Sequence, residues 1–420
     1  MAHGFYCGID FGTSNSSIAI AGSRQMPVLV PVENTKDTIP STIFYGTDNP
    51  APLFGNAAIA AYINGEQGRF MRSLKRVLGT DLMSAGTIIN GKSAKFENIL
   101  IQFIKHLKRK AEVISKEEIN DVVMGRPVHF RDNDPKGDAA AENELRQIAG
   151  QVGFKNIAFQ YEPIAAAYAH EANLKGESLA CVVDIGGGTS DFTVIRLGAE
   201  HRLKTDRSDD ILASSGVRIG GNDFDKSLCI SSFMPALGMK TTYGNKNLPV
   251  PSSQYFDLAE WSKVNSAYSF QNQRIIRQVL SEAHDKNKYA RLLELVEKEK
   301  GHELLGQVEA AKIALTNENE NLQILKFLQD KPEIKSNRQE FNNAIKDNVE
   351  KTRQAVMECL VQAQAKAEEI ELIILTGGST EIPYVQKELC GIFPKAVISG
   401  ENKLSSVGLG LAYDSLRIFA

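Results

Sequence analysis

Two stretches of this chain repeat one pattern: Gly8-Ile9-Asp10-Phe11-Gly12-Thr13-Ser14-Asn15-Ser16-Ser17-Ile18-Ala19-Ile20 and Val182-Val183-Asp184-Ile185-Gly186-Gly187-Gly188-Thr189-Ser190-Asp191-Phe192-Thr193-Val194-Ile195. Each predicts an apolar strand that ends in an aspartate, a turn of Gly, Thr and Ser, and a second apolar strand. Asp10 and Asp184 lie 174 positions apart in the 420-residue chain. The repetition predicts two duplicated halves that face one ligand.

The turn residues of both stretches indicate that the ligand carries phosphates. Glycines let backbone N–H groups approach an anion closely, successive N–H groups form a concave anion site, and Thr and Ser hydroxyls add donors. An aspartate repels phosphate, so Asp10 and Asp184 imply a cation between them and the ligand. Oxygen ligands suit Mg²⁺, which keeps most of its waters. Two Gly-rich hairpins without a ligand are the alternative, and the matched Asp and Thr residues favour the phosphate site.

Composition and charge describe an ordinary globular chain of roughly two to four domains. The chain has 48 basic and 51 acidic residues, and this balance predicts neither nucleic acid nor an anionic membrane surface as a partner. Its five cysteines lack CxxC spacing and indicate buried thiols in a reducing compartment. We see no signal peptide and no apolar run near the ~18 residues of a membrane span, and we expect a soluble cytoplasmic protein.

The order of apolar patterns predicts an α/β protein whose second half begins near residue 179. We expect strands over 5–10, 16–21, 26–32, 39–45, 121–125, 157–160 and 371–376. We expect helices over 56–63, 68–78, 98–114, 139–152, 163–172, 275–316, 339–367, 383–392 and 405–417. Residues 198–210 predict a charged turn, and residues 235–275, which are rich in Pro, Gly, Ser and Asn, predict an inserted part with an exposed Trp261.

Two of the predicted helices are rich in small residues, at 163–169 and 407–413. Small side chains let helix backbones come nearer than the usual 8–10 Å or so. Because each helix closes one half, we expect the two to cross and to form a hinge. Two ordinary Ala/Gly-rich core helices are the alternative.

Taken together, these residues resemble the nucleotide-binding domain of the 70-kDa heat-shock (DnaK) family. The resemblance rests on phrases in the family's order, at 8–17, 74–79, 161–168, 184–191, 220–225, 308–316 and 375–383. It implies a duplicated actin-like ATPase (ribonuclease H-like) fold, with two lobes around a nucleotide cleft. The implied lobes are 1–178 and 179–420, and the second carries an inserted subdomain around 226–316.

The resemblance also implies a role for individual residues. The implied catalytic residues are Lys75, Thr189, Asp10, Asp184 and Glu162; Lys75 would orient the attacking water and Glu162 would sense the metal shell. The implied Mg²⁺ carboxylates are Asp10, Asp184 and Asp191. The implied nucleotide-binding residues are Gly12, Thr13, Ser14, Gly186, Gly187, Gly188, Thr189, Gly220, Gly221, Glu309, Lys312, Thr316, Gly377, Gly378 and Ser379.

The chain departs from the family pattern in several places. Glu381 stands where the family usually has an arginine on the adenine face, so a cation–π contact is lost there. The 126–138 segment lacks a clear counterpart of a family arginine that acts in interdomain signalling, and 235–275 is longer than usual. The sequence ends at Ala420 without the family's apolar linker and peptide-binding domain, so it resembles the short bacterial YegD-type branch.

The sequence favours an ATP- or ADP-binding, Mg²⁺-dependent chaperone-like switch that hydrolyses ATP slowly. A small-molecule kinase and an actin-like, nucleotide-controlled scaffold or reactivase are the alternatives. A kinase needs a general base for its acceptor, and we find no unassigned Asp motif to supply one. The turn Gly186–Gly188 leads into a strand, which disfavours a Rossmann dehydrogenase. Beyond nucleotide, we expect a separate protein partner or client.

Overall fold

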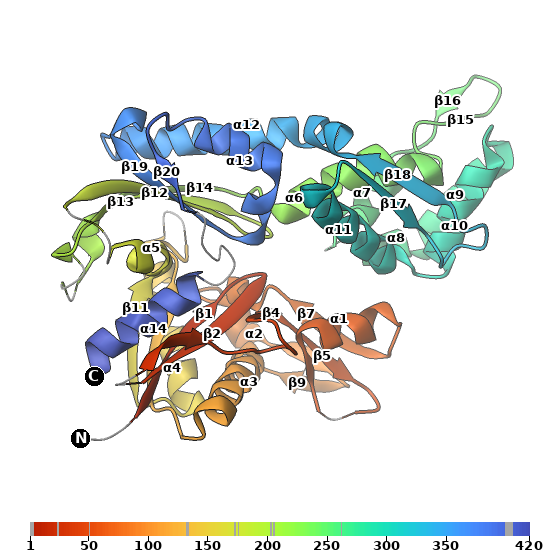
Figure 1. Cartoon of the computed structure of the whole chain (residues 1–420). Helices are drawn as coiled ribbons and strands as arrows, with labels where there is room; N and C mark the ends of the chain where they lie inside the picture. Colours follow the sequence, from red (N-terminus) through yellow and green to blue (C-terminus); the bar gives the residue numbers. More distant parts are fainter. Residues whose placement is uncertain are drawn as a thin grey trace. The chain divides into compact units, whose positions relative to one another are not determined.

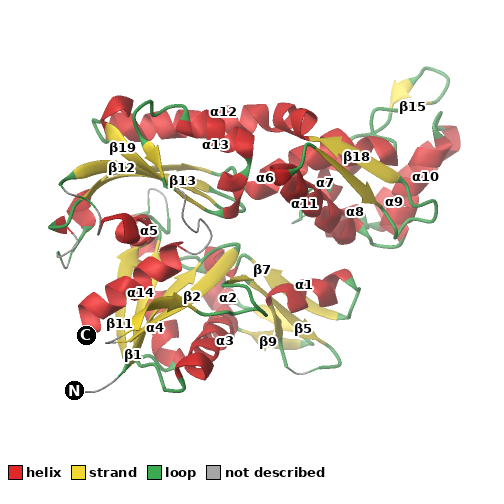
Figure 2. Ribbon diagram, viewed as in Figure 1, coloured by secondary structure: helices red, strands yellow, loops and turns green. Residues whose placement is uncertain are grey.

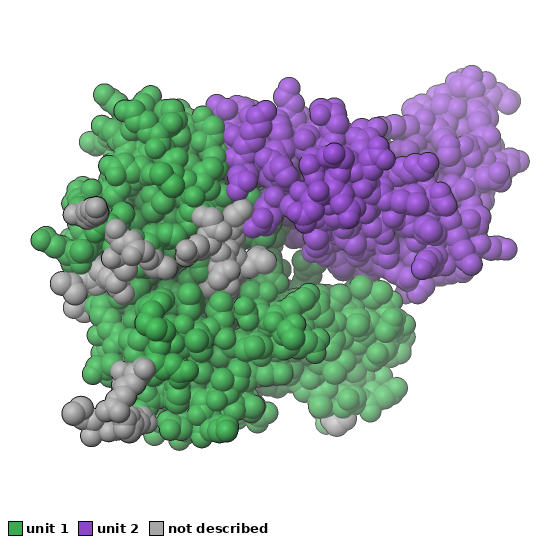
Figure 3. All heavy atoms as spheres, in the orientation of Figure 1, with its two compact units in different colours: residues 1–216, 355–380, 390–420 green, residues 217–354, 381–389 purple. Residues whose placement is uncertain are grey.

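The computed structural model describes residues 4–22, 25–49, 51–131, 134–171, 174, 176–201, 204, 206–261, 263–399 and 406–420 (Figure 1). The chain mixes helices and strands throughout (Figure 2). It forms two compact units (Figure 3). The first unit comprises residues 1–216, 355–380 and 390–420, and the second comprises residues 217–354 and 381–389. The first unit therefore includes residues on both sides of position 178, where the sequence predicts a lobe boundary.

The first unit is built from two main sheets and the helices that pack on them. Its strands are β1 (Phe5–Phe11), β2 (Asn15–Gly22), β3 (Gln25–Leu29), β4 (Thr38–Pro40), β5 (Thr42–Gly46), β6 (Leu53–Phe54), β7 (Gly68–Arg72), β8 (Thr87–Ile89), β9 (Lys92–Ala94), β10 (Asp121–Arg126), β11 (Asn156–Tyr161), β12 (Ser178–Ile185), β13 (Ser190–Leu197), β14 (Ile211–Val217), β19 (Ile370–Thr376) and β20 (Val397–Ile398). Its helices are α1 (Gly55–Ile63), α2 (Leu82–Ala85), α3 (Phe96–Ser115), α4 (Pro135–Val152), α5 (Glu162–Glu171) and α14 (Ser406–Phe419), with 3₁₀ turns at η1 (Leu74–Val77), η3 (Ser208–Asp210), η6 (Ala367–Glu369) and η7 (Gly378–Glu381).

The two main sheets share one topology. The first sheet has the order β11-β10-β1-β2-β3, with β4 also paired to β2, and the second has the order β20-β19-β12-β13-β14. In both, the hairpin that carries the repeated stretch is antiparallel, and two further strands follow in parallel pairing on the side of its first strand. The repeated stretches thus occupy equivalent places in two sheets of the same topology.

The helices α3 and α4 cover one face of the first sheet. Buried side chains of α3 lie at 99, 100, 103, 104 and 107, which is the apolar face that its sequence predicts. The helix α4 begins at Pro135, after Asp134 caps it by accepting a hydrogen bond from the Gly137 N–H, and Gly153 ends it at φ 106°. Residues of both helices join β1, β2 and β10 in one apolar core.

The helices α5 and α14 cross in close contact, as the sequence predicts (Figure 1). A Cβ at Gly410 would overlap the Ala165 carbonyl oxygen, so only glycine fits at this crossing. The rings of Tyr168 and Tyr413 stack with centroids 5.9 Å apart. The predicted helix ends at Ala172 and Ser405 lie outside the described residues. The hinge role of this crossing stays a prediction.

The second unit is mainly helical. It contains α6 (Gly221–Leu228), the π-helical turn η4 (Cys229–Phe233), the 3₁₀ turn η5 (Met234–Leu237), α7 (Ser253–Leu258), α8 (Val264–Ala267), α9 (Phe270–Glu282), α10 (Lys286–Glu297), α11 (Gly301–Asn317), α13 (Pro383–Cys390) and two hairpins, β15 (Thr242–Tyr243) with β16 (Leu248–Pro249) and β17 (Glu320–Ile324) with β18 (Glu333–Asn337). The helix α12 (Arg338–Gln362) crosses the boundary between Gln354 and Ala355.

Two local predictions are wrong. Residues 68–78 do not form one helix, because β7 pairs with β5, with Phe70 opposite Phe44, and Ser73 takes a left-handed φ of 56° before the 3₁₀ turn η1. Trp261 is half-buried and not exposed, because its ring packs 5.3 Å from the ring of His302.

Cys7, Cys181, Cys229 and Cys359 are buried free thiols, as predicted, and Cys390 is half-buried.

Candidate functional site

Strand alternation places Asp10 and Asp184 on the sheet faces that carry α5 and α14. Side chains alternate between the two faces of a strand. In β1, Ile9 joins the core under α3, whereas a Cβ at Gly8 would meet the backbone of Leu411 in α14, so Asp10 shares the α14 face. In β12, Val182 packs in the core with α5 and α14, and Asp184 follows two positions later on the same face. The two aspartates of the repeat therefore point into one region of the first unit.

A lysine and a glutamate complete a charged cluster around these aspartates. Lys75 lies on η1 and Glu162 is the first residue of α5. The Lys75 Nζ donates to Glu162 Oε1 at 2.5 Å, and the two side chains are 9% and 15% exposed. Structure thus brings together four of the predicted catalytic residues from separate places in the sequence.

The cluster contains three carboxyl groups and one ammonium group, and the pKa values of its members are shifted as a result. Burial, then the charge of Glu162, raise the pKa of Asp10 to about 8, although Lys75 opposes this rise. Burial and Glu162 raise the pKa of Asp184 to about 6, while a hydrogen bond from Thr376 and the charge of Lys75 lower it. Burial lowers the pKa of Lys75, but Glu162 and the two aspartates outweigh it and raise that pKa.

This donor set fits a hydrated divalent cation. Three carboxylates, those of Asp10, Asp184 and Glu162, share the single ammonium of Lys75 in a buried cluster. An added cation offsets the excess negative charge and favours the ionised carboxylates. Within the described parts of the chain, no group of three or more His, Cys, Asp or Glu side chains is arranged to hold a metal directly. Oxygen donors of this kind fit Mg²⁺, which binds oxygen ligands and keeps several of its waters.

The two turns after the aspartates are shaped by backbone contacts. A Cβ at Gly12 would overlap the Asn15 carbonyl oxygen, and the Ser41 hydroxyl donates to the Gly12 carbonyl at 2.7 Å. In the second turn, the Gly186 N–H donates to the Thr189 carbonyl at 3.0 Å. A Cβ at Gly188 would meet no atom within 4 Å, so this turn leaves space for a ligand. The first turn thus requires a glycine at 12, and the second leaves open space at 188.

The turns also position three more of the predicted residues. The Thr189 hydroxyl donates to Asp191 Oδ2 at 3.0 Å. The Ser379 hydroxyl donates to the Gly186 carbonyl at 3.3 Å, which brings 377–379 against the second turn. Gly377 has a φ of +79°, which only glycine adopts readily. The residues 186–191 and 377–379 therefore form one continuous surface.

A cavity of about 80 Å³ opens beside the cluster, within the first unit. Glu162, Asp184 and Asp191 line it, together with Thr376 and residues 127–129 and 214–216. The motifs of the sequence predict no role for Thr376, although this residue directly precedes the Gly377-Gly378 pair. Its position at the end of a predicted strand, directly before two glycines, is the sequence feature that could have identified Thr376 as a site residue.

The other predicted nucleotide-binding residues lie in the second unit, on α6 and α11. The Lys312 Nζ contacts Asp225 Oδ2 at 2.8 Å and the Gly221 carbonyl oxygen at 3.4 Å. The structure thus brings Lys312 to the Gly220-Gly221 turn that opens α6. Glu309 is exposed, and the Thr316 hydroxyl donates to the Lys312 carbonyl one helical turn away at 3.3 Å.

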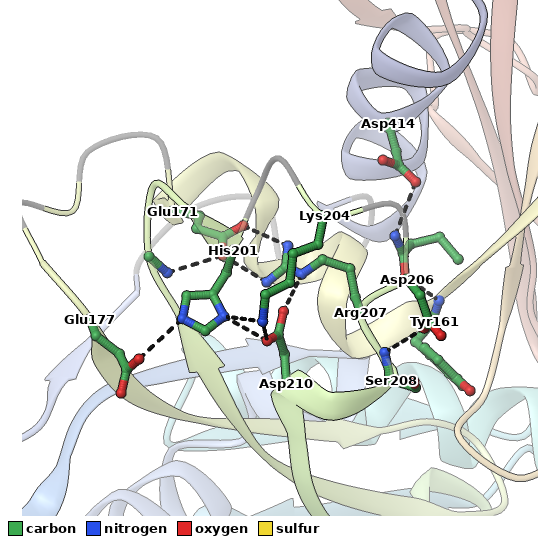
Figure 4. Close-up of polar contacts among 12 residues, drawn as sticks. Tyr161, Glu171, Glu177, His201, Lys204, Asp206, Arg207, Ser208, Asp210 and Asp414 are labelled. Atoms are coloured by element: carbon green, nitrogen blue, oxygen red, sulfur yellow. Dashed lines mark hydrogen bonds and ion pairs between the residues drawn. The ribbon is translucent and has the colours of Figure 1, made fainter.

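The far end of α5 carries a buried ion-pair network that the sequence did not predict (Figure 4). Arg207 donates to both oxygens of Glu171 at 2.7 and 2.9 Å and to Asp210 at 2.5 Å. His201 and Lys204 each contact Asp210 at 2.6 Å. The described part of 198–210 is therefore fastened to α5, the helix whose first residue is Glu162. The segment that the sequence predicts to be a charged turn therefore forms buried ion pairs with α5.

Comparison with protein families gives the class to which this fold and site belong. The family model described as Hsp70 protein matches residues 6–244 and 270–415. The chain belongs to the Hsp70 family, as the motifs of its sequence predict. The match leaves out residues 245–269, inside the segment that the sequence analysis marked as longer than usual.

Curated relatives agree with this assignment at low identity. The chain is 28% identical over 417 residues to "Chaperone protein DnaK" of Thermosipho africanus, and this covers 97% of the chain and 58% of that protein. It is 26% identical over 428 residues to "Chaperone protein HscA homolog" of Rickettsia africae, covering 98% of the chain and 57% of that protein. The chain thus spans somewhat over half the length of these relatives. Of the helices that the structure describes, none is long and apolar enough to cross a membrane.

Proposed function

We propose that the chain binds ATP or ADP with Mg²⁺ and hydrolyses ATP slowly, as a chaperone-like switch on a two-lobed, actin-like fold. One observation carries the proposal: the buried Lys75–Glu162 pair lies with Asp10 and Asp184 beside two equivalent Gly-rich turns. Membership of the Hsp70 family supports the choice of ATP over other phosphate ligands.

Different residues of the chain bind the phosphates and stabilise the transition state. The Lys75 ammonium orients the attacking water and offsets the charge that develops as the γ-phosphoryl group leaves. Glu162 holds that ammonium in place. Backbone N–H groups of the turns at 12–14 and 187–188, with the Thr189 hydroxyl, bind the phosphate oxygens, while the Gly186 N–H donates within its own turn. When bound, Mg²⁺ neutralises phosphate charge, and Asp10, Asp184 and Asp191 hold its waters.

The nucleoside part of the ligand has its own set of proposed contacts. We assign the ribose and adenine to Gly220, Gly221, Glu309, Lys312, Thr316, Gly377, Gly378 and Ser379. Lys312 is already anchored by Asp225, so it presents a fixed charge. Because Glu381 replaces a stacking arginine, we expect a weak preference for ATP over GTP.

The chaperone part of the proposal concerns a protein partner or client. The relatives above are named as chaperones, and the chain covers 58% of the first of them. We place the partner surface around residues 245–269, which the family match leaves out and where Leu248 and Phe256 are 48% and 44% exposed. Nucleotide can control that surface because a ligand shifts a conformational equilibrium by its differential affinity.

Calorimetric titration with ATP, ADP and GTP, each with Mg²⁺ and with EDTA, tests the nucleotide site. We expect Mg²⁺-dependent binding of ATP and ADP and slow hydrolysis in a single-turnover assay. Absence of nucleotide binding would overturn the proposal. Phosphoryl transfer to a panel of sugars and polyols, at rates above hydrolysis, would establish the kinase alternative instead.

A further inference from the structure

We propose that Thr376 is a positioning residue that orients the Asp184 carboxylate toward the magnesium ion of Mg·ATP. This inference rests on the proposed nucleotide function and names a residue that sequence and family did not assign. It starts from the strand pairing of the second sheet, in which the parallel register of β12 and β19 sets Asp184 opposite Thr376.

Register and burial fix the Thr376 hydroxyl against the carboxylate. Paired residues of neighbouring strands point to the same face of a sheet. Thr376 is 3% exposed and lines the same cavity as Asp184, and hydrogen bonding by its side chain lowers the pKa of that carboxyl. A β-branched side chain in a strand has few rotamers. The direction of the Thr376 hydroxyl is therefore set mainly by the strand, because the side chain is short and has few rotamers.

The next residue closes a second side of the carboxylate. A Cβ at Gly377 would lie 2.7 Å from Asp184 Oδ1 and would overlap the Ile185 carbonyl oxygen. The chain therefore turns tightly around the carboxylate directly after Thr376. An ionised carboxylate accepts about four hydrogen bonds or metal-bound waters. With one position taken by Thr376 and one side closed by Gly377, the remaining positions face the cavity.

The equivalent aspartate of the first sheet lacks such a donor. Ile9 lies opposite Met124 in the parallel pair β1–β10, so the residue beside Asp10 on β10 is Gly125. A Cβ at Gly125 would approach the Glu162 Cγ to 3.2 Å, so this place is left open for Glu162. The parallel strand thus supplies Asp184 with a threonine and Asp10 with a glycine, while Glu162 acts on both aspartates. Outer partners of this kind orient metal-binding groups.

The test compares variants that keep or remove the hydroxyl. Thr376→Val keeps the branched shape and loses the donor, whereas Thr376→Ser keeps the donor. Thr42→Val is the matched control, because Thr42 is a buried threonine of the same unit whose hydroxyl donates to the Gly55 carbonyl. The measurement is the free Mg²⁺ concentration that gives half-maximal ATP binding to the full chain, with ATP binding in EDTA as a second readout.

We expect Thr376→Val to raise this Mg²⁺ concentration on the order of tenfold and to leave binding in EDTA unchanged. Thr376→Ser and Thr42→Val should behave as the wild type. Should Thr376→Val not fold, Thr376→Ala and Thr376→Ser give the same comparison, since they differ by the hydroxyl alone. An unchanged Mg²⁺ dependence in the variants without the hydroxyl overturns the role of Thr376 while the nucleotide function stands. A wild-type chain that binds no Mg·ATP overturns both.

Discussion

The two main sheets of the first unit repeat one strand–Asp–turn–strand hairpin, yet they surround its aspartate differently. Burial and Glu162 raise the pKa of both aspartates, to about 8 for Asp10 and to about 6 for Asp184, and hydrogen bonding by Thr376 lowers the pKa of Asp184 alone. The residue in the equivalent parallel strand is Gly125 in one sheet and Thr376 in the other. The comparison teaches that duplication supplied a symmetric scaffold, and that neighbouring strands made its two carboxylates unequal.

The largest effect we expect follows from the lysine that serves both aspartates. Lys75→Ala should slow single-turnover ATP hydrolysis on the order of 10²–10³-fold, because positioned charge acts mainly on the transition state. ATP affinity should change far less. Arg76→Ala is the matched control, since it removes the same charge from an exposed neighbour. Hydrolysis at the wild-type rate in Lys75→Ala would show that the catalytic assignment is wrong.

A second pair of variants measures the inequality of the two aspartates directly. Asp184→Asn should weaken Mg²⁺-dependent ATP binding on the order of 10- to 100-fold. Asp10→Asn should cost less at pH 7, because a carboxyl with a pKa of about 8 is mostly protonated there before metal binds. The two Mg²⁺ titration curves give the comparison. Equal losses would mean that the sheets contribute equivalent carboxylates.

The crossing of α5 and α14, which close the two sheets, gives a smaller effect on stability. Gly410→Ala should lower the free energy of unfolding by about 1–3 kcal/mol, because its Cβ meets the Ala165 carbonyl oxygen. Gly150→Ala is the control, since no atom lies within 4 Å of its Cβ position in α4. That change should be neutral or stabilising. Denaturant unfolding of both variants decides whether close packing matters here.

The last prediction is a pH dependence of the stability of the nucleotide-free protein. The pKa values of Asp10 (about 8) and Asp184 (about 6) lie above the unfolded value of about 3.9. Between the unfolded pKa and each folded pKa, the folded state binds more protons than the unfolded state. The free energy of unfolding therefore falls as the pH rises toward about 6 and then about 8. Thermal unfolding from pH 5.5 to 8.5 should show this fall, and Asp10→Asn should flatten it. An identical slope in Asp10→Asn would contradict the raised pKa, and Mg·ATP should stabilise most at high pH.

Much of the site follows from local sequence. The hairpins around Asp10 and Asp184 could be predicted because apolar strands and glycine turns are encoded within a dozen residues. The face of α3 and the small residues of α14 could be predicted for the same reason, since helix periodicity is local. The small residues at 407–413 predict a close helix crossing, and Gly410 meets Ala165 at that crossing.

Contacts between distant residues could not be predicted in this way. The segment 68–72 has a helical pattern but forms β7, because pairing with Phe44 and its neighbours in β5 outweighs local preference. The charged turn at 198–210 gave no sign that Arg207 would be buried between Glu171 and Asp210. Such pairings depend on which chain segments the fold brings together.

The sequence by itself determined the repeated hairpins, their aspartates and the family, because each is written in a short run of residues. The tertiary structure alone decided which residues surround those aspartates. Strand register set Thr376 opposite Asp184, and the start of α5 set Glu162 against Lys75, near both aspartates. Burial then shifted the pKa values, since the cost of charge depends on the neighbours and the solvent that folding leaves around a group.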